Sequence, residues 1–437
     1  MIVSQAFKGK TYAVLGLARS GLATVETLVA SGARVVAWDS REEARAAVAD
    51  KAELGDPMEI DLAGFDGIVV SPGVPLNKHP IAMRAKIAGV PIIGDIELFA
   101  LARPTLPPHK VVGITGTNGK STTTALIHHI IEQAGFPARM GGNIGLPILG
   151  QEPLEPNLHG VGVYVLELSS YQIDLTHSLD CDVAVLLNIT PDHLDRYNGF
   201  AGYVASKARL FAMQSVEHVA VIATEDEPSR GIAASAPAQL REVKAADIDP
   251  EAQLGWPSLQ GPHNAQNAAV AIAVGRALDI DDATIMAALA SYASLPHRMQ
   301  AVGTHNGVLY VNDSKATNAA STAPALGAWP ARDGKPRIHW ILGGVAKSDN
   351  LDECAPYYGN IAHAYTIGEA GHMFADLLRP HMAVDDSEML SAAVRRAARI
   401  AQPGDVVLLS PACASFDQFR DFEARGDAFA AAVNALE

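Results

Sequence analysis

The sequence predicts an α/β fold with parallel sheets, divided into three domains. The chain has 437 residues, more than the ~100–200 residues of an ordinary domain. Short apolar segments alternate with helical segments along its length, a pattern typical of parallel sheets covered by helices on both faces. Hydrophobic residues make up 49% of the chain and charged residues 19%, which is enough to fill large cores and excludes a disordered protein.

Charge and cysteine content narrow the function further. A net charge of −15 argues against a general binder of nucleic acid or anionic membranes, although a local basic pocket for phosphates is compatible with it. The three cysteines are far apart and lack a zinc or CxxC spacing, which predicts small core thiols in a reducing cytoplasm. No apolar run reaches the roughly 18 residues of a membrane span, and Met1–Lys10 lacks the apolar stretch of a signal peptide. We therefore expect a cytoplasmic protein that neither binds nucleic acid nor enters a membrane.

The first domain, residues 1–103, is predicted to be Rossmann-like. An apolar strand, Tyr12–Leu15, precedes the glycine turn Gly16–Gly21 and a helix, and a second strand, Arg34–Trp38, ends at Asp39. This order is that of a βαβ unit that binds nucleotides. Only two glycines of the full dinucleotide motif are present, so a simple tight turn is the alternative. Further strands are predicted at Gly67–Val70 and Val90–Ile93.

The second domain, residues 104–298, begins with a linker. Three prolines between Arg103 and His109 prevent a helix there. The strand Lys110–Ile114, a Gly/Thr loop and a helix ending near Gly135 then predict a central parallel sheet of the P-loop ATPase type. The remaining predicted elements are strands at Val163–Leu168, Asp182–Ile189 and His218–Ala223 and a buried helix at Asn264–Leu278.

The third domain, residues 299–437, follows a second junction at Leu295–Arg298. Its apolar strands alternate with helices, as in the first domain, and predict a second Rossmann-like fold with a parallel sheet. The strands are expected at Val308–Asn312, Ile338–Leu342, Ala364–Ile367 and Val406–Leu409.

The strongest chemical signal is the segment Thr115–Thr122, Thr-Gly-Thr-Asn-Gly-Lys-Ser-Thr. It follows a predicted strand and opens a predicted helix, where backbone N–H groups and the helix N-terminus favour a polyphosphate. Lys120 can neutralise the β- and γ-phosphates, and the Ser121 hydroxyl can hold Mg²⁺. The spacing departs from the strict P-loop pattern, because Ile114 stands five residues before Gly119. A surface turn is the alternative, but the strand–loop–helix context favours a nucleotide site.

Further side chains suit metal or phosphate chemistry. Glu167 ends a predicted strand, where α/β sheets place ligand sites, and His193 follows the next strand. A carboxylate with an imidazole suits a divalent cation. The alternatives are a salt bridge or helix cap for Glu167 and a plain hydrogen bond for His193. Lys207 lies on a predicted helix, Gly202–Met213, where a lysine is ordinarily solvated. Arg298, at the second junction, suits a clamp on ATP phosphates as the third domain closes, with an interdomain salt bridge as the alternative.

These motifs together resemble those of the Mur ligase family, which includes the folylpolyglutamate synthases. Beyond the ATP loop Thr115–Thr122, the resemblance covers essentially the whole chain. It rests on Gly142–Gly145, Glu167–Gln172, Asn188–Asp195, Ser206–Arg209, His263–Asn264 with Asn267, His297–Arg298 and Asn312–Thr317. Within the family the chain is most similar to the ligases that add D-glutamate. That similarity rests on Gly16–Gly21, Ser71–Gly73, Asp95–Phe99, Leu409–Ser415 and Asp417–Phe419.

The resemblance implies an ATP-dependent ligase of peptidoglycan synthesis. Such an enzyme joins UDP-N-acetylmuramoyl-L-alanine to D-glutamate through an acyl phosphate, with ATP and two Mg²⁺ ions, and we expect a monomer. The implied catalytic residues are Lys120, Glu167, His193 and Lys207, the last as a carbamylated lysine that joins the metal site. The implied Mg²⁺ ligands are Ser121, Glu167, His193 and Lys207.

The resemblance also assigns substrate contacts. Contacts with ATP are implied at Gly116, Thr117, Asn118, Gly119, Lys120, Ser121, Thr122, Asn267, Arg298 and Asp313. The first domain is implied to hold the uridine nucleotide, with Arg19 and Ser20 near the diphosphate and Asp39, Ser40 and Arg41 near uracil. The other implied substrate contacts are Ser71, Gly73, Asn143, Lys315, Thr317, Lys347, Ser415 and Phe422, with Thr317, Lys347 and the Ser415–Phe422 region toward D-glutamate.

One position departs from the family pattern. Many D-glutamate ligases have an acid before the lysine that corresponds to Lys347, but here Val345 and Ala346 stand in its place. That departure weakens the case for an acidic partner and leaves Lys347 itself available.

Three competing functions stand beside this interpretation. A sister ligase, such as a folylpolyglutamate synthase, shares the ATP loop but lacks a uridine-type first domain. A nicotinamide oxidoreductase is suggested by Gly16–Gly21 and Asp39, and a non-enzymatic P-loop regulator is the third. The segment Gly116–Ser121 argues against the oxidoreductase, and the complete set of ligase residues argues against the regulator.

Overall fold

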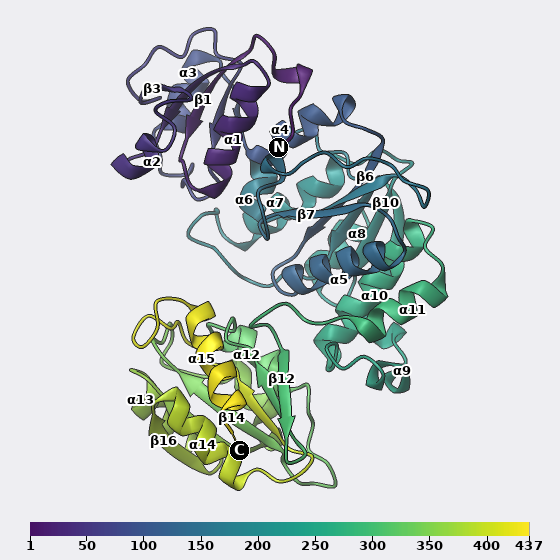
Figure 1. Ribbon diagram of the computed structural model, residues 1–437, viewed down its shortest axis with the longest axis vertical. Helices are drawn as coiled ribbons and strands as arrows, with labels where there is room; N and C mark the ends of the chain where they lie inside the picture. Colours follow the sequence, from purple (N-terminus) through teal and green to yellow (C-terminus); the bar gives the residue numbers. More distant parts are fainter. Residues whose placement is uncertain (437) are drawn as a thin grey trace. The chain divides into compact units, whose positions relative to one another are not determined.

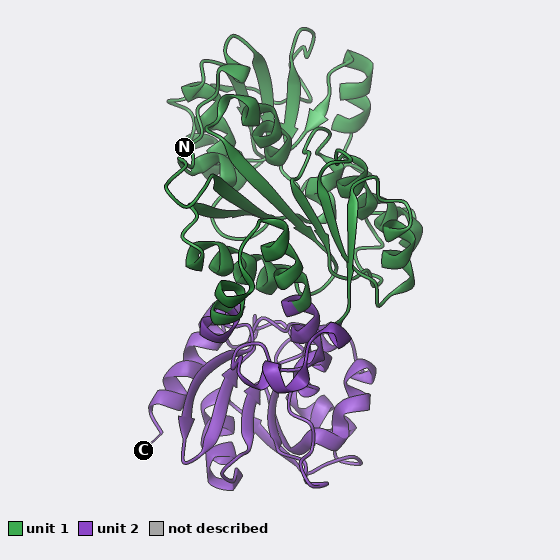
Figure 2. Ribbon diagram, turned by 90° about the vertical axis from the view of Figure 1, so that its right-hand side faces the viewer, with its two compact units in different colours: residues 1–244, 269–288 green, residues 245–268, 289–437 purple. Residues whose placement is uncertain are grey.

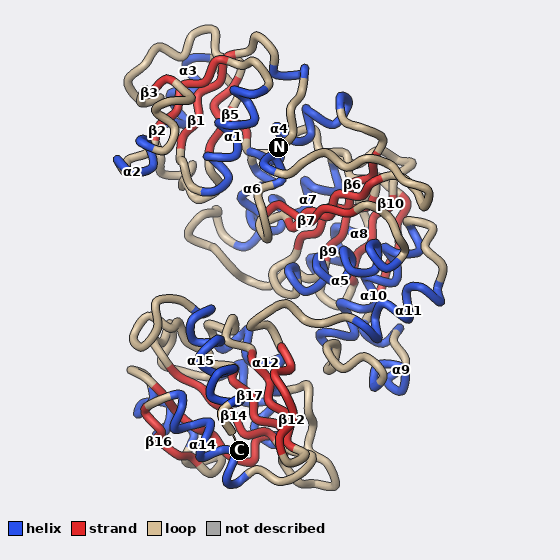
Figure 3. The backbone as a smooth tube through the Cα atoms, viewed as in Figure 1, coloured by secondary structure: helices blue, strands red, loops and turns tan. Residues whose placement is uncertain are grey.

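The computed structural model describes residues 1–436, which contain three β-sheets with helices packed along them (Figure 1, Figure 3). The chain falls into two compact units (Figure 2). Unit 1 comprises Met1–Lys244 and Ala269–Ala288 and holds the first two sheets; unit 2 comprises Ala245–Ala268 and the chain from Leu289 onward and holds the third. The α/β architecture is confirmed, and the boundaries expected after residues 103 and 298 stay predictions.

The first sheet has five parallel strands in the order β3-β2-β1-β4-β5, which is a Rossmann order. Its strands are β1 (Thr11–Leu15), β2 (Arg34–Trp38), β3 (Glu53–Leu54), β4 (Gly67–Val70) and β5 (Ile92–Ile93). Its helices are α1 (Arg19–Ala30), α2 (Glu42–Ala46), α3 (Ile81–Ala88) and α4 (Asp95–Ala102). The largely apolar strands β1, β2 and β4 begin and end within one residue of the prediction. The expected strand at Val90–Ile93 is shorter, since only its last two residues pair with β4.

The second sheet has six parallel strands in the order β11-β10-β9-β6-β8-β7. Its strands are β6 (His109–Thr115), β7 (Ala138–Gly142), β8 (Gly162–Glu167), β9 (Val183–Leu186), β10 (Val219–Ala223) and β11 (Gln239–Val243). The helices that follow these strands are α5 (Lys120–Gln133), α6 (Ser170–Asp174), α7 (Phe200–Ala212), α8 (Glu227–Ala233), α9 (Pro250–Leu254), α10 (Pro262–Ala277) and α11 (Asp282–Ser291). The strands missed by the sequence, β7 and β11, are the two edges, where partial exposure allows polar residues and glycine.

The third sheet has six strands in the order β12-β13-β17-β14-β15-β16. Its strands are β12 (Gln300–His305), β13 (Val308–Asn312), β14 (Ile338–Gly343), β15 (Ile361–Ile367), β16 (Val384–Glu388) and β17 (Val406–Leu409). Its helices are α12 (Ala319–Leu326), α13 (Gly371–Leu378), α14 (Leu390–Ile400) and α15 (Phe422–Asn434). The parallel arrangement that the sequence predicts is confirmed for β13 to β17. At one edge a strand that was not predicted, β12, pairs antiparallel with β13 across a turn with positive φ at Asn306 and Gly307. The sequence did not predict this hairpin because β12 is only partly buried and not continuously apolar.

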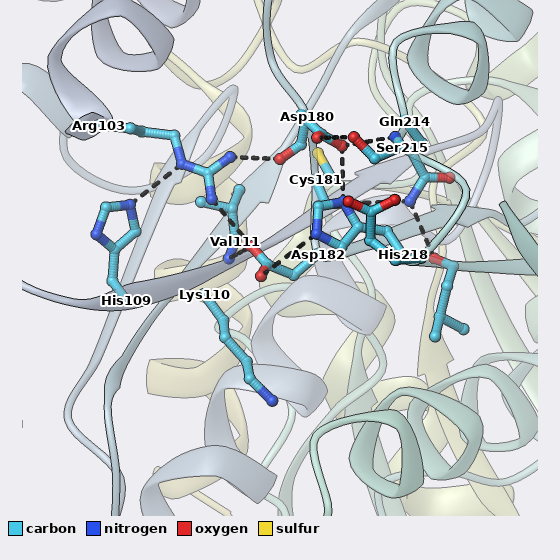
Figure 4. A network of polar contacts seen from close by, with 12 residues as sticks. Arg103, His109, Lys110, Val111, Asp180, Cys181, Asp182, Gln214, Ser215 and His218 are labelled. Carbon is cyan, nitrogen blue, oxygen red and sulfur yellow. Dashed lines mark hydrogen bonds and ion pairs between the residues drawn. The ribbon is translucent and has the colours of Figure 1, made fainter.

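The predicted linker forms a polar network at the amino-terminal end of the central sheet (Figure 4). After α4 the chain makes a 3₁₀ turn, Arg103–Thr105, and the prolines keep it from continuing as an α-helix. The Arg103 guanidinium donates to the Asp182 carboxylate (2.9 Å) and to the Asp180 carbonyl oxygen. It also donates to His109 Nε2 (3.2 Å), while His109 Nδ1 lies 2.7 Å from the Pro107 carbonyl oxygen. The linker is therefore fixed to the strands that it precedes.

The cysteines and the helices agree with the expectations of core thiols and of no membrane-spanning segment in residues 1–436. Cys181, Cys354 and Cys413 are all free and buried, which confirms the prediction of core thiols. Within residues 1–436, none of the helices combines the length and the apolar character that crossing a bilayer requires.

Candidate active site

The loop between β6 and α5 has the geometry of a phosphate cradle. Gly119 has φ of 83°, a left-handed conformation that favours glycine, and α5 begins at the next residue. A Cβ on Gly116 would lie 3.0 Å from the Cβ of Leu187, so the backbone there runs close to its neighbour. The loop is also held from β9, since the Thr117 N–H donates to the Asn188 carbonyl (2.8 Å) and the Asn118 N–H donates to Asn188 Oδ1 (2.9 Å). These two N–H groups are therefore occupied, and the loop that they fix leads directly into the N-terminus of α5, whose first N–H groups have no partner within the helix.

Two lysines converge on one carbonyl of this loop. Lys120 Nζ donates to the carbonyl oxygens of Gly116 and Thr117, each at 2.8 Å. Lys207 Nζ also donates to the Gly116 carbonyl at 2.8 Å, and its distance to Thr115 Oγ1 is 3.3 Å. The sequence alone favoured a solvated Lys207, but on α7 this side chain is only 1% exposed. Burial, followed by the charge of Lys120, lowers the pKa of Lys207 well below its ordinary value.

Glu167 lies at the carboxyl end of β8 with half of its carboxylate unpaired. Oε1 accepts a hydrogen bond from Asn143 Nδ2 at 2.8 Å. Oε2 is buried and has no hydrogen-bond partner among residues 1–436. Gly142 makes the close approach of the Asn143 loop possible, because a Cβ there would lie 2.2 Å from the Glu167 carbonyl oxygen. An unpaired buried carboxylate oxygen is costly unless a ligand uses it, and an oxygen ligand of this kind fits Mg²⁺.

His193 lies in the loop after β9, with its side chain 50% exposed. Its φ of 52° is unusual for a residue with a side chain. The ring stands beside the Tyr171 ring, with centroids 5.2 Å apart, and Nε2 lies 3.4 Å from the Asp192 carboxylate. Among residues 1–436, no three His, Cys, Asp or Glu side chains form a group that could hold a metal.

Arg196 and Tyr171 lie in this region, although the sequence analysis assigned no role to Arg196. The Arg196 guanidinium lies over the Tyr171 ring, 4.1 Å from its centroid. It donates to the carbonyl oxygens of Pro72 (3.3 Å), Gly73 (3.3 Å) and Val74 (3.0 Å). It thereby joins the His193 loop to the Ser71–Gly73 turn after β4. Contacts with backbone carbonyls leave no pattern in a sequence, and only the place of Arg196 directly after the Asn188–Asp195 motif could have drawn attention to it.

A cavity of about 420 Å³ lies beside this arginine. It is lined by the 72–77 segment on one side and by α6 and α7 on the other. Both sides belong to unit 1, and the predicted site residues Ser71 and Gly73 lie next to its wall.

The predicted uridine-nucleotide residues lie on the loops that follow β1 and β2. Asp39 accepts hydrogen bonds from the Leu17 N–H (2.8 Å) and from the backbone and side chain of Arg41 (2.9 and 3.2 Å). Burial acts to raise its pKa, but these hydrogen bonds outweigh burial and lower the pKa to about 2. Asp39 is thus a paired anion that orders the glycine turn, while Ser40 and Arg41 are exposed.

The other predicted nucleotide contacts surround the first turn of α1. Arg19 Nη2 donates to the Gly145 carbonyl at 2.6 Å. Ser71 Oγ donates to the Gly16 carbonyl at 2.9 Å. Ser20 and Ser71 both border a cavity of about 10 Å³. The structure therefore brings Arg19, Ser20 and Ser71 to one edge of the first sheet.

In unit 2, the residues predicted to hold the amino acid gather at the carboxyl ends of the third sheet's strands. Lys347 Nζ lies 3.3 Å from Thr317 Oγ1, so these two predicted substrate residues are neighbours. Lys315 Nζ stands 4.0 Å from the centroid of the Phe422 ring. Ser415 is 2% exposed in the loop after β17. Val345, which replaces the expected acid, pairs its backbone N–H and carbonyl with those of Ala414 at 2.9 and 3.0 Å.

Three further residues predicted to contact ATP belong to unit 2: Asp313, Arg298 and Asn267. Asp313 is buried, and its carboxyl group accepts hydrogen bonds from Ser410 Oγ (2.8 Å) and the Met299 N–H (3.2 Å). Burial raises its pKa to about 7. Arg298 lies between two residues with positive φ, His297 at 62° and Met299 at 47°, so the junction has an unusual backbone. Asn267 is buried on α10 and donates to Asn264 Oδ1 at 3.1 Å.

Three family models match consecutive parts of the chain. They are the N-terminal domain of Mur ligases of the MurD-like type over residues 10–94, the Mur ligase middle domain over 114–255, and the Mur ligase glutamate ligase domain over 297–413. The UDP-N-acetylmuramoylalanine–D-glutamate ligase of Novosphingobium aromaticivorans is 66% identical, with 100% of this chain and 97% of that protein covered. The chain belongs to the Mur ligase family.

Other members of the Mur ligase family support this placement. The enzyme of the same name from Sphingopyxis alaskensis is 64% identical, with 100% of both chains covered. Among solved structures, the MurF ligase of Thermotoga maritima in complex with ADP has a TM-score of 0.61 at 16% identity, with 99% of this chain and 96% of that chain covered. The UDP-N-acetylmuramate–alanine ligase MurC of Thermotoga maritima has a TM-score of 0.55 at 16% identity, with 98% and 99% covered. These two likenesses show that the Mur ligase fold is shared.

Proposed function

We propose that this Mur ligase joins D-glutamate to UDP-N-acetylmuramoyl-L-alanine, with ATP activating the carboxylate as an acyl phosphate. Two relatives that align with the whole of this chain, at 66% and 64% identity, carry the name of that ligase. The observation that carries the chemistry is the phosphate cradle of Gly116–Gly119, next to Lys120 and Lys207. A carboxylate is a poor acyl donor, so transfer of a phosphoryl group to it must precede attack by an amine.

The phosphoryl step is governed by charge and position. Lys120 Nζ is held at the cradle through the carbonyls of Gly116 and Thr117, where it can offset charge on the β- and γ-phosphates of ATP. The cradle N–H groups and the N-terminus of α5 add partial positive charge at the same place. Fixed groups of this kind stabilise a transferring phosphoryl group without reorganising during the reaction.

Mg²⁺ fits the acidic side of this site. The residues that would hold it are Glu167, through the unpaired Oε2, with Ser121, His193 and a modified Lys207. When bound, Mg²⁺ offsets the charge of phosphate oxygens and orients them. Asn143 Nδ2 donates to Glu167 Oε1, and this hydrogen bond orients the carboxylate so that Oε2 is left for the cation.

Carbamylation of Lys207 would convert a repulsive cation into a metal ligand. Its neutral amine attacks CO₂, forms an N–C bond and releases one proton, which leaves an anionic carbamate. Burial and the nearby Lys120 favour the neutral amine that this step requires. The carbamate keeps one N–H, which can still donate to the Gly116 carbonyl, and it adds oxygen atoms of the type a hard cation prefers.

The amino-acid substrate is a dianion, and the cluster in unit 2 suits it. Lys347 and Thr317 adjoin, and the Ser415 loop supplies a hydroxyl and backbone N–H groups. The D-glutamate amine attacks the acyl carbon, a tetrahedral intermediate forms, and phosphate leaves as the amide forms. We also propose that the protein acts as a monomer in the cytoplasm, as expected from the sequence.

The test is ADP release measured with UDP-N-acetylmuramoyl-L-alanine and either D- or L-glutamate. We expect release that needs both the nucleotide substrate and D-glutamate. Release supported by a folate and glutamate instead would favour the sister ligase. Saturable binding of a reduced nicotinamide cofactor, measured by its fluorescence, would favour the oxidoreductase, and an absence of substrate-stimulated release would favour a regulator.

A further inference from the structure

Arg425, in the first turn of α15, is a buried cation at the centre of unit 2. It is 1% exposed. Its Nε donates to Ser314 Oγ at 3.0 Å, and Nη2 donates to the carbonyl oxygens of Ser314 (2.9 Å) and Cys413 (3.0 Å). Its Nη1 donates to the carbonyl oxygens of Ala414 (3.3 Å) and Gly343 (3.4 Å). The guanidinium is therefore fully used in hydrogen bonding.

The acceptors belong to three different loops. Ser314 follows β13, Gly343 ends β14, and Cys413 and Ala414 follow β17. These are the loops that lead to Thr317, Lys347 and Ser415, the proposed amino-acid contacts. A further hydrogen bond, from Ser314 Oγ to the Phe422 carbonyl (2.8 Å), returns the network to the start of α15. Arg425 thus contacts every segment on which the proposed amino-acid site is built.

Among residues 1–436 the five hydrogen bonds of this guanidinium all go to carbonyl or hydroxyl oxygens, and the carboxylate of Asp417 acts on it only through its charge. Burial lowers the pKa of Arg425 to about 10, so the group keeps its charge at neutral pH. A buried charge that makes no contact with a carboxylate costs stability, and a neutral core would be the simpler solution for folding alone.

The surrounding backbone is shaped to admit the guanidinium. Gly344 has φ of 129°, and a Cβ there would lie 2.2 Å from the Ala414 carbonyl and 3.2 Å from Arg425 Nη1. A Cβ on the next residue of the helix, Gly426, would lie 2.1 Å from His297 Nδ1. Both glycines keep the loops close to the first turn of α15, and a larger residue at either place would move them apart.

We propose that Arg425 is the positioning residue of the amino-acid site, which holds the three loops so that Thr317, Lys347 and Ser415 meet the carboxylates of the substrate. The planar guanidinium is suited to this task because its five N–H groups point in fixed directions toward several loops at once. Lysine has three donors on a flexible stem and cannot reach all of these acceptors together. The inference rests on the proposed function, because it takes the amino acid as the ligand of this cluster.

The test is Arg425→Lys in the full-length enzyme, with the KM of each substrate measured separately. We expect the KM for D-glutamate to rise about tenfold or more, because hydrogen bonds from a charged group to the loops are lost. The KM for ATP and that for the nucleotide substrate should change by less than about twofold. Arg379→Lys, an exposed arginine after α13 that pairs with Asp376, is the matched control and should leave all three values unchanged.

A second variant covers the case in which Arg425→Lys does not fold. Ser314→Ala keeps the arginine but removes one acceptor, and it should raise the KM for D-glutamate by a smaller factor in the same direction. Equal changes in the KM for ATP and for D-glutamate, or an unchanged KM for D-glutamate in a folded variant, would overturn the proposal. If the wild type proves to use another amino acid, the proposed function fails, and the same comparison made with that acceptor still decides the role of Arg425.

Discussion

The two ends of the central sheet share the same strands but differ in how their charged groups are paired. At the amino-terminal end, Arg103, Asp180, Asp182 and His218 pair with one another or with nearby backbone (Figure 4). At the carboxyl-terminal end, Glu167 keeps a buried oxygen without a partner, and Lys207 is buried without a carboxylate partner in the described residues. Paired charges stabilise the fold, whereas unpaired buried groups are costly and are retained where a ligand uses them. The comparison separates the end of the sheet that maintains structure from the end at which we propose that substrates react.

The largest effect is expected from a comparison of two lysines near opposite ends of β6. Lys110 lies on the strand itself, and Lys120 begins α5 after the loop that follows the strand. Lys120→Ala should lower kcat by about 10²–10³-fold or more, because it removes the fixed charge at the phosphates. Lys110→Ala, at the amino-terminal end near Asp279, should leave kcat unchanged. Steady-state ADP release and thermal unfolding of both variants provide the measurement. An active Lys120→Ala enzyme would remove the phosphate-cradle assignment.

Lys207 tests whether the carboxyl-terminal end holds an anion. Lys207→Ala should be nearly inactive and should recover part of its activity when a small carboxylate is added, since the added anion can replace the carbamate. Lys207→Arg should stay inactive because a guanidinium is not carbamylated. The mass of the wild-type protein, measured under conditions that preserve a carbamate, should exceed the mass calculated from its sequence by that of one CO₂. Near-normal turnover of Lys207→Ala would contradict the proposal.

Two isosteric changes of carboxylate to amide compare stability at the two ends. Asp182→Asn weakens the contact with Arg103 and should destabilise the fold by about 1–3 kcal/mol, with KM values unchanged. Glu167→Gln should lower kcat while the melting temperature stays the same or rises, because an unpaired buried charge is removed. Thermal unfolding and ADP release are measured on both. If Glu167→Gln lost as much stability as Asp182→Asn, the two ends of the sheet would not differ in the way that we propose.

The smallest effect is a pH dependence at the amino-terminal end. Burial lowers the pKa of His109, whose Nε2 must stay unprotonated to accept the hydrogen bond from Arg103. The neutral form therefore stabilises the fold above the ordinary histidine pKa of about 6.5, and this contribution is lost as pH falls through the lower folded value. We expect the melting temperature of the wild type to fall further than that of His109→Gln when the pH is lowered from about 7.5 to about 5. Parallel curves for the two proteins would show that His109 is not responsible.

The sequence predicted the carboxyl-terminal end of the central sheet better than the other features. Continuous apolar segments located β6, β8 and β10 within one or two residues, because a strand buried on both faces has no polar alternation. Glycine and lysine at fixed spacing predicted the turn between β6 and α5, since the positive φ of Gly119 favours glycine, and its role in binding phosphate stays a prediction.

What the sequence missed depends on contacts between distant segments. The partners of Arg196 and Arg425 are backbone carbonyls, which any residue can supply, so neither arginine could be told from a surface one. The burial of Lys207 depends on how α7 packs beside the cradle. The antiparallel β12 was missed because an exposed edge strand does not need apolar residues.

The three buried cysteines allow the opening of each unit to be measured in the unmodified protein. Burial raises the pKa of each thiol to about 12, so almost no thiolate is present at neutral pH while the fold is closed. Alkylation must then wait for a local or global opening event that exposes the sulfur. Cys181 lies in unit 1, whereas Cys354 and Cys413 lie in unit 2. The alkylation rate at each cysteine, read by mass spectrometry, therefore gives the opening free energy of each unit without an added label.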